Sequence, residues 1–215
     1  MREPMESAIA GIVLAAGASR RMGRPKALLP IADDTFVTRL VRTLRQGGAD
    51  TIVVVVGAEA DAIAAALEHA GAAATIAVNP RPEDGQLSSL VVGIEALSGV
   101  DAAGALVCLV DAPLVRAATV ARLIETFRRT GAPIVRPRSG DRHGHPVLFS
   151  RALFDELRCA DRAVGAKAVV RAHTGEIAAV DVDDEGAFVD IDTPDEYRRW
   201  IEAGIRDSGL GIRND

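Results

Sequence analysis

The sequence predicts a three-layer α/β/α fold with a mainly parallel, Rossmann-like sheet, and two observations carry this prediction. Short apolar runs alternate along the chain with segments whose apolar residues recur at helical spacing, which is the pattern of an α/β protein. Among the 215 residues, 48% are hydrophobic but only 3% are aromatic, so the core must be built from Ala, Val, Leu and Ile. Such residues suit a parallel sheet that is covered by helices.

Strand and helix patterns alternate regularly over the first two thirds of the chain. The expected strands are Ala8–Leu14, Thr51–Val56, Ala74–Val78, Ala105–Val110 and Pro133–Arg136. The expected helices are Phe36–Gln46, Glu59–His69, Ser88–Leu97 and Thr119–Arg129. Glycine follows the first, second and fourth of these helices, as is usual where a helix ends.

The last third of the chain is less regular. The expected elements are a strand at Pro146–Phe149, helices near Ala152–Leu157 and Ala163–His173, and a β-hairpin made by Ile177–Val182 and Phe188–Asp190. We interpret the acidic run Asp181–Glu185 as the solvated tip of that hairpin. A final helix is expected to start at Thr193 or Pro194 and to run to Ala203, because proline and acidic residues suit a first turn.

Length and charge limit the possible classes of protein. We expect one domain over residues 1–206, followed by a polar, frayed tail at 207–215. The chain has 25 Lys and Arg residues against 30 Asp and Glu residues, which leaves a net charge of −5 at pH 7. A protein without a general basic field is not expected to bind nucleic acid non-specifically.

Cysteine content and hydropathy predict a cytoplasmic protein. Cys108 and Cys159 are the only cysteines, too few for a disulfide framework or a zinc knuckle, and they fit a reducing compartment. Residues 1–7 are too polar for a signal peptide, and no apolar stretch approaches the ~20 residues of a membrane span. We therefore expect neither a membrane nor a nucleic acid among the partners.

The loop after the first expected strand has the composition of a polyphosphate site. It holds small residues between basic ones, namely Gly17, Ser19 and Gly23 with Arg20, Arg21, Arg24 and Lys26. Small residues let backbone N–H groups approach phosphate oxygens, and Arg and Lys neutralise the charge. The loop matches neither the mononucleotide P-loop nor the Gly-x-Gly-x-x-Gly fingerprint. A solvated basic loop is the alternative interpretation.

Carboxylates follow two later strands, and ligands of open α/β sheets bind beyond the carboxyl ends of strands. Asp111 comes directly after a buried apolar run, where an acid is costly unless it is paired or binds a cation such as Mg²⁺. Its alternative role is to cap the turn into the next helix. Asp192 lies at a second expected strand end, although it or Asp190 could instead stabilise the N-terminus of the last helix.

Polar residues also follow the third expected strand and the fifth. Asn79 precedes a loop with Gly85, Ser88 and Ser89, and one of the serines is expected to cap the following helix. Asn79 could equally serve the turn that it forms with the next proline.

Two histidines lie two residues apart, at His143 and His145, which is weak evidence for zinc.

Three arginines surround that histidine loop. Arg136, Arg138 and Arg142 could meet a phosphate on a second substrate, and a solvated surface is the equal alternative. The sequence has no Cys–His pair for covalent catalysis and no Gly-x-Ser-x-Gly elbow, so nothing in it supports covalent hydrolase chemistry.

The chain resembles a known family over residues 9–203. Residues 14–26 are similar to the Leu-Ala-Ala-Gly-x-Ser-x-Arg-Met-Gly-x-x-Lys signature of nucleotidyltransferases that resemble molybdenum cofactor cytidylyltransferase, and every fixed position is present. Gly144–Phe149 resembles a second segment of the family, on the side that receives the acceptor. Where the family usually has Gly-Asp-Gln-Pro, this chain keeps the acid and the proline around Asp111 but lacks the glutamine.

The resemblance implies a fold of the nucleotide-diphospho-sugar transferase type and a Mg²⁺-dependent reaction. A phosphate on the acceptor would attack the α-phosphate of an NTP, and pyrophosphate would leave. The implied catalytic residues are Lys26, Arg21 and Asp111, and the implied metal ligands are Asp111 and Asp192. The implied nucleotide-binding residues are Leu14, Ala15, Ala16, Gly17, Ala18, Ser19, Arg21, Lys26, Asn79, Gly85, Ser88 and Ser89. The implied acceptor-binding residues are His145, Pro146 and Arg138.

The resemblance also implies the substrates. Ala16 favours CTP, because guanylyltransferase relatives usually carry glycine there, and the implied acceptor is the molybdopterin cofactor. Three alternatives stay open. The chain could use GTP or another NTP, it could act on a sugar, polyol or lactate phosphate, or it could be a nucleotide-binding chaperone or oxidoreductase without transfer activity.

Overall fold

The computed structural model describes residues 8–17 and 22–202. Its strands are β1 (Ala8–Ala15), β2 (Pro30–Ile31), β3 (Asp34–Thr35), β4 (Thr51–Val56), β5 (Thr75–Val78), β6 (Ala102–Leu109), β7 (Ile134–Ser139), β8 (Arg142–His143), β9 (Val147–Ser150) and β10 (Ile177–Asp181). The main sheet has the order β10-β7-β9-β6-β1-β4-β5, with β8 paired to β7, and β2 and β3 form a separate small ribbon.

The sheet is mainly parallel, as predicted. The central strand β1 pairs in parallel with β4 and β6, β4 pairs in parallel with β5, and β10 pairs in parallel with β7. Strand β9 runs antiparallel to both of its neighbours, β6 and β7, and the short β8 pairs antiparallel with β7. The insertion of β9 carries the loop before it to the same edge of the sheet as the carboxyl ends of β1 and β6.

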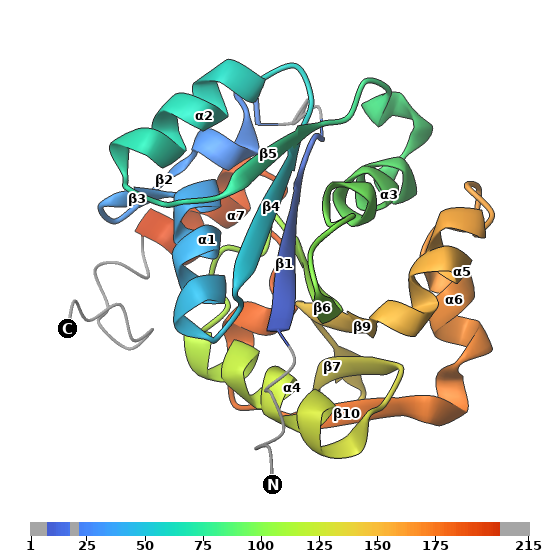
Figure 1. The fold of residues 1–215 in the computed structure, drawn as a ribbon. Helices are drawn as coiled ribbons and strands as arrows, with labels where there is room; N and C mark the ends of the chain where they lie inside the picture. Colours follow the sequence, from blue (N-terminus) through green and yellow to red (C-terminus); the bar gives the residue numbers. More distant parts are fainter. Residues whose placement is uncertain (1–7, 18–21, 203–215) are drawn as a thin grey trace, which may run out of the picture.

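Helices cover both faces of this sheet, which gives the predicted three layers (Figure 1). They are α1 (Phe36–Gln46), α2 (Ala60–His69), α3 (Gln86–Ala96), α4 (Ala117–Thr130), α5 (Phe154–Cys159), α6 (Lys167–Ala172) and the short α7 (Pro194–Tyr197), which a π-helical turn at Arg198–Glu202 continues. Helices α1, α2 and α4 bury apolar side chains in one core cluster, whereas α3, α5 and α6 bury theirs in another. Across residues 8–17 and 22–202, no helix has the length and apolar character that crossing a membrane requires.

Local sequence signals locate the regular elements well. Helix α1 and strand β4 have the predicted bounds, because each has strong periodicity or a continuous β-branched run. The helix expected at Ala163–His173 is shorter, since α6 begins only at Lys167 after a turn that contains Gly165 with a φ of +75°. Helix α3 begins two residues earlier than expected.

That earlier start changes the role of the serines in α3. The N-cap is Gly85, whose φ is +93°, and neither Ser88 nor Ser89 caps the helix. The hydroxyl of Ser88 instead donates to the carbonyl oxygen of Gly85 at 2.7 Å. The expectation of a serine cap was therefore wrong, because a glycine with positive φ ends the preceding turn more readily.

The predicted hairpin near the C-terminus was also wrong. Strand β10 pairs in parallel with β7, and Phe188–Asp190 is no strand, because a 3₁₀ turn forms at Glu185–Phe188 instead. The acidic run is only partly solvated, since Asp184 is 4% exposed. The chain after β10 thus crosses the carboxyl edge of the sheet instead of turning back on itself. Residues 203–206 and the tail at 207–215 lie outside the described residues.

One histidine ties α5 to the end of α6. The imidazole Nε2 of His173 lies 2.8 Å from Glu156 Oε2, and its Nδ1 lies 2.8 Å from Glu176 Oε1. Both ring nitrogens can donate only in the imidazolium form. The hydrogen bond to Glu156 is the largest influence that raises the pKa of His173, and the bond to Glu176 is the next.

We expect His173→Gln to remove stability only in a defined pH range. Because the pKa of the folded imidazole lies above its ordinary value of about 6.5, the stabilisation is present below that value and is lost as the pH rises through the raised pKa. Urea unfolding of the unmodified protein and of His173→Gln, between about pH 5.5 and about pH 9, measures the difference between their free energies of unfolding. In a background that carries Glu176→Gln, the loss of unfolding free energy caused by His173→Gln should be smaller. A difference that stays constant over this range would contradict the role.

Candidate functional site

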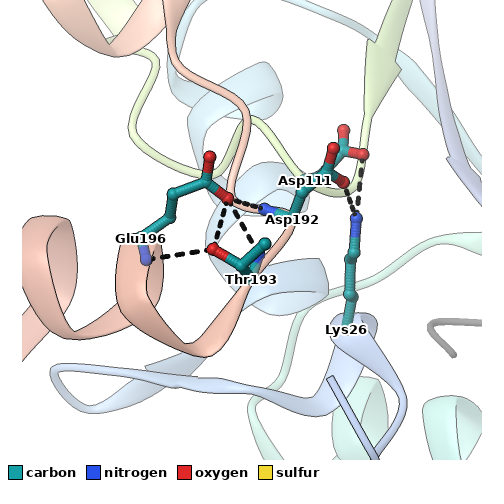
Figure 2. Close-up of polar contacts among 5 residues, drawn as sticks. All are labelled: Lys26, Asp111, Asp192, Thr193 and Glu196. Carbon is teal, nitrogen blue, oxygen red and sulfur yellow. Dashed lines mark hydrogen bonds and ion pairs between the residues drawn. The ribbon is translucent and has the colours of Figure 1, made fainter. Parts of the chain in front are cut away.

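Three charged side chains meet at the carboxyl edge of the sheet (Figure 2). Asp111 follows β6, and Lys26 opens a 3₁₀ turn at Lys26–Leu28 in the loop that follows β1. The ammonium Nζ of Lys26 lies 3.3 Å from Asp111 Oδ2 and donates a short hydrogen bond to Asp192 Oδ1. Residues that are 166 positions apart in the chain are thereby brought into direct contact.

The electrostatics of this cluster favour a bound cation. Burial is the largest single influence on Lys26 and lowers its pKa, but the hydrogen bonds and charges of Asp192 and Asp111 together outweigh it, so the pKa is raised. The pKa of Asp190 is raised by partial desolvation and then by the neighbouring charge of Asp111. Oxygen Oδ1 of Asp111 is buried and has no hydrogen-bond partner among the described residues. This unsatisfied acceptor fits a hard cation such as Mg²⁺.

The carboxylates would form only part of a metal shell. Within the described residues, no group of three or more His, Cys, Asp or Glu side chains is arranged to hold a metal ion. Asp111 and Asp192 could supply two oxygens, and phosphate or water oxygens would complete the octahedral shell that Mg²⁺ requires.

Backbone hydrogen bonds hold Asp192 in place. The N–H of Ile191 donates to the carbonyl oxygen of Asp111 at 2.7 Å, which joins the two acidic segments. Glu196 Oε2 accepts the N–H groups of Asp192 and Thr193 at 2.8 Å each (Figure 2). These bonds, the one from Asp192 first, lower the pKa of Glu196. The residue that caps α7 is Thr193, and stabilisation of this helix N-terminus by Asp190 or Asp192 stays an alternative.

A buried carboxylate anchors the segment that leads to Asp192. Asp184 Oδ2 accepts hydrogen bonds from the backbone N–H of Arg116 at 2.9 Å and from Thr119 Oγ1 at 2.5 Å. These groups belong to the first turn of α4, which has no side-chain cap of its own. Asp184 therefore acts as a distant cap that fixes residues 182–192 against the N-terminus of α4.

Two glycines allow this segment to pack tightly against neighbouring loops. A Cβ atom on Gly186 would lie 2.1 Å from the carbonyl oxygen of Leu114, and one on Gly144 would lie 2.0 Å from the carbonyl oxygen of Ala187. The N–H of His145 donates to that same oxygen of Ala187 at 2.8 Å. The loop before β9, the loop after β6 and residues 184–192 thus form one close-packed unit.

The expected nucleotide residues gather beside this unit, as far as the structure describes them. Leu14 and Ala15 end β1, and Ala16 and Gly17 follow the strand. Leu14, Ala15 and Ala16 are 7–8% exposed. Ala18, Ser19 and Arg21 lie outside the described residues.

A polar cluster follows β5. The amide Nδ2 of Asn79 donates to the hydroxyls of Ser88 and Ser89 at 2.9 Å each. Its Oδ1 accepts the N–H of Arg81 at 2.9 Å, so Asn79 holds the turn as well as the serines.

A cavity of about 490 Å³ opens between the sheet, α3 and α6. His145 lines it and is largely buried, which lowers its pKa, while the charges of Asp190 and Asp111 act in the opposite direction. His145 therefore lies between the cavity and the carboxylates. The peptide bond that joins it to Pro146, a buried residue, is cis. Sequence reasoning missed Gln86 and Lys167 as lining residues, because no local signal shows that α6 folds over the sheet.

The arginines of the histidine loop divide into two kinds. Arg138 pairs with Asp181 through two bonds of 2.8 Å, and Arg142 pairs with Glu185 through bonds of 2.7 and 2.8 Å. Neither arginine is among the residues that line the cavity, whereas Arg136 is. Arg138 thus pairs with Asp181, its cross-strand neighbour on β10, and of the three expected acceptor residues only His145 lines the cavity.

Comparisons with known proteins agree with this architecture. The MobA-like NTP transferase domain matches residues 11–177. The chain is 32% identical to the nicotine blue oxidoreductase of Paenarthrobacter nicotinovorans over 200 residues, which cover 90% of this chain and 96% of that protein. It is 35% identical to a probable molybdenum cofactor guanylyltransferase of Opitutus terrae over 134 residues, which cover 62% of this chain and 63% of that protein.

Solved structures show the same likeness. The crystal structure of Rv0371c from Mycobacterium tuberculosis H37Rv superposes with a TM-score of 0.78 at 34% identity, covering 92% of this chain and all (100%) of that one. A crystal structure of Rv0371c in complex with manganese superposes with a TM-score of 0.71 at the same 34% identity, again covering 92% and 100% of the two chains.

We expect Asp184→Ala to destabilise the fold by about 2 kcal/mol, because it leaves the N–H of Arg116 and the hydroxyl of Thr119 without their buried acceptor. Asp183→Ala is the matched control, since Asp183 is exposed and only its backbone oxygen contacts Arg116. Denaturant unfolding should place the control within about 0.5 kcal/mol of the unmodified protein. Equal losses for the two variants would refute the anchoring role of Asp184.

Proposed function

Because the chain belongs to the MobA-like NTP transferase domain family, whose members are nucleotidyltransferases, we propose a specific reaction for it. It transfers a nucleoside monophosphate from an NTP, preferably CTP, to a phosphorylated acceptor, with release of pyrophosphate. The observation that carries the proposal is the contact of Lys26 with Asp111 and Asp192 beside a cavity. A cation and two carboxylates at the carboxyl edge of an α/β sheet suit a metal-bound triphosphate.

The reaction needs no covalent protein intermediate. An oxygen of the acceptor phosphate forms a bond to the α-phosphorus of the NTP, and the bond from that phosphorus to the bridging oxygen of pyrophosphate breaks. Lys26 would turn from the carboxylates to the α-phosphate and stabilise the charge that develops there. Mg²⁺ held by Asp111 and Asp192 would neutralise phosphate oxygens, and the manganese complex of Rv0371c supports a divalent ion.

The nucleotide would lie along the end of β1. Backbone N–H groups from Leu14 to Ser19, together with Arg21 and Lys26, would hold the triphosphate. The polar cluster of Asn79, Ser88 and Ser89, with Gly85 in the adjacent turn, would face the ribose and base. Both hydroxyls could match the donors and acceptors of a cytosine.

The cavity would receive the acceptor. His145 lines it next to the carboxylates, and Pro146 follows His145 in the chain, so an acceptor phosphate held there could reach the α-phosphate. Molybdopterin is the acceptor we propose, in line with the guanylyltransferase of Opitutus terrae, which is named for that cofactor.

A second candidate function is that of an oxidoreductase. The similarity to nicotine blue oxidoreductase over 90% of this chain favours it. Incubation with each NTP, Mg²⁺ and a panel of phosphorylated acceptors, followed by measurement of pyrophosphate, distinguishes the two. In a parallel incubation with NADH or NADPH and an added quinoid dye as electron acceptor, oxidation of the nicotinamide, with no pyrophosphate released in the first assay, would support the oxidoreductase and reject the transferase.

We expect Lys26→Met to lower the transfer rate at least a hundredfold, or about 2.7 kcal/mol, because the developing charge loses its ammonium partner. Pyrophosphate release under saturating substrate measures the effect. Arg129→Met is the control for the lost positive charge, since Arg129 is exposed on α4.

Thermal melting of the Lys26 variant checks that it folds. Asp192→Asn, which keeps Lys26, should instead raise the Mg²⁺ concentration for half-maximal activity, since an amide oxygen is a poorer ligand. A loss in Lys26→Met of less than about tenfold would refute the phosphate role.

We expect CTP to bind more tightly than GTP by a factor of about 10 to 200, because the methyl group of Ala16 narrows the site for the larger base. Calorimetric titration with each nucleotide and Mg²⁺ measures both affinities. Ala16→Gly should then raise the affinity for GTP. Equal or tighter binding of GTP by the unmodified protein would reject the cytidylyl assignment and leave nucleotidyl transfer intact.

A further inference from the structure

Arg136 is a positive charge without a partner in the wall of the cavity. Its Nε atom is buried and finds no hydrogen-bond acceptor in the part of the chain that the structure describes, and no carboxylate of that part pairs with it. Its neighbours differ, since Arg138 and Arg142 each form a double ion pair. Of the three arginines around this loop, only the one that faces the cavity is left uncompensated.

An uncompensated guanidinium needs a physical reason. Partial burial lowers the pKa of Arg136, because the guanidinium loses hydration. Buried polar groups in folded proteins are nearly always satisfied, so an unsatisfied donor in a cavity wall calls for an acceptor, such as a bound ligand or water. A second orphan lies in the same wall, because Nδ1 of His145 is also buried without a partner.

The rest of the cavity agrees with an anionic ligand. Its polar lining residues are Gln86, Arg136, His143, His145, Arg162 and Lys167. No Asp or Glu of the described residues lines it, although the chain as a whole is acidic. The remaining walls are largely apolar, with Leu87, Leu90, Val147 and Phe149 among them. The volume of about 490 Å³ suits a small molecule.

We propose that Arg136 is the residue that determines acceptor specificity, and that it binds the phosphate of a monoester whose body is poor in hydroxyl groups. The planar fork of arginine matches phosphate oxygens in pairs. A polyol or sugar phosphate would leave hydroxyl groups unpaired against the leucine, valine and phenylalanine walls, which is costly. This inference rests on the proposed function, since it selects among the acceptors that the reaction allows.

The test uses phenyl phosphate and glycerol 3-phosphate as probes of equal charge and different bodies. Calorimetry on the full chain should show that phenyl phosphate binds about tenfold more tightly than glycerol 3-phosphate. Arg136→Met should weaken the binding of phenyl phosphate about tenfold. Arg142 lies in the same loop but is ion-paired outside the cavity, so Arg142→Met should change this affinity less than about twofold. Equal affinity for the probes, or equal losses in the variants, would overturn the proposal.

Amide NMR locates the bound probe. Shifts at Gly144 and Gly165, which both line the cavity, are expected on addition of phenyl phosphate. Shifts confined to the loop around Gly23 would place the probe at the triphosphate loop and overturn the proposal. Arg136→Lys, which keeps the charge but not the planar fork, should bind phenyl phosphate more tightly than Arg136→Met does. It also serves as the folded variant if the methionine variant does not fold.

Stability separates binding from a structural role. Arg136→Met should melt no lower than the unmodified protein, because it removes a desolvated charge without breaking an ion pair. A clear loss of stability in both Arg136 variants would assign the residue a structural role instead. Nucleotide binding by Arg136→Met should be unchanged. If phenyl phosphate does not bind while Lys26→Met still abolishes transfer, only the role of Arg136 is rejected. If no NTP binds, the proposed function is rejected.

Discussion

The arrangement of the site depends on one buried carboxylate. Asp184 accepts hydrogen bonds from the first turn of α4 and thereby holds the chain that crosses the carboxyl edge of the sheet. From that anchor the segment runs to Ile191, whose N–H bonds to the carbonyl oxygen of Asp111. Asp192 is consequently held within reach of Lys26. A carboxylate outside the reactive cluster thus joins two of its members, which come from opposite ends of the sequence.

Several side-chain atoms around this edge are buried without a hydrogen-bond partner among the described residues, Oδ1 of Asp184 among them, and two of the others belong to side chains of opposite charge. Oδ1 of Asp111 is a buried acceptor without a donor, next to the ammonium of Lys26. Nε of Arg136 is a buried donor without an acceptor, in the wall of the cavity. His145 lies between the two regions and contributes a further unsatisfied atom, Nδ1. The edge therefore has one part that is complementary to cations and an adjacent part that is complementary to anions.

Local patterns were enough to predict α1, β4 and the parallel core, because periodicity and β-branched runs act within a few residues. They failed where distant contacts decide. The hairpin after β10 was wrong because the parallel pairing of β10 with β7 and the cap that Asp184 provides to α4 are invisible in a local window. The motif residues Lys26, Asp111 and Asp192 do meet as expected. By contrast, the sequence does not show that Arg136 lines the cavity while Arg138 pairs with Asp181, because both arginines lie on the same face of β7.

The close contacts at Gly144 and Gly186 have an evolutionary consequence. A single added methyl group at either position would overlap a carbonyl oxygen of a neighbouring loop, at 2.0 and 2.1 Å, and backbone cannot move aside as a flexible side chain can. The surrounding arginines and the residues of α6 meet no such barrier. A descendant of this chain could therefore exchange side chains around the cavity, and with them the ligand that the cavity takes, while the backbone that positions Lys26, Asp111 and Asp192 would stay unaltered.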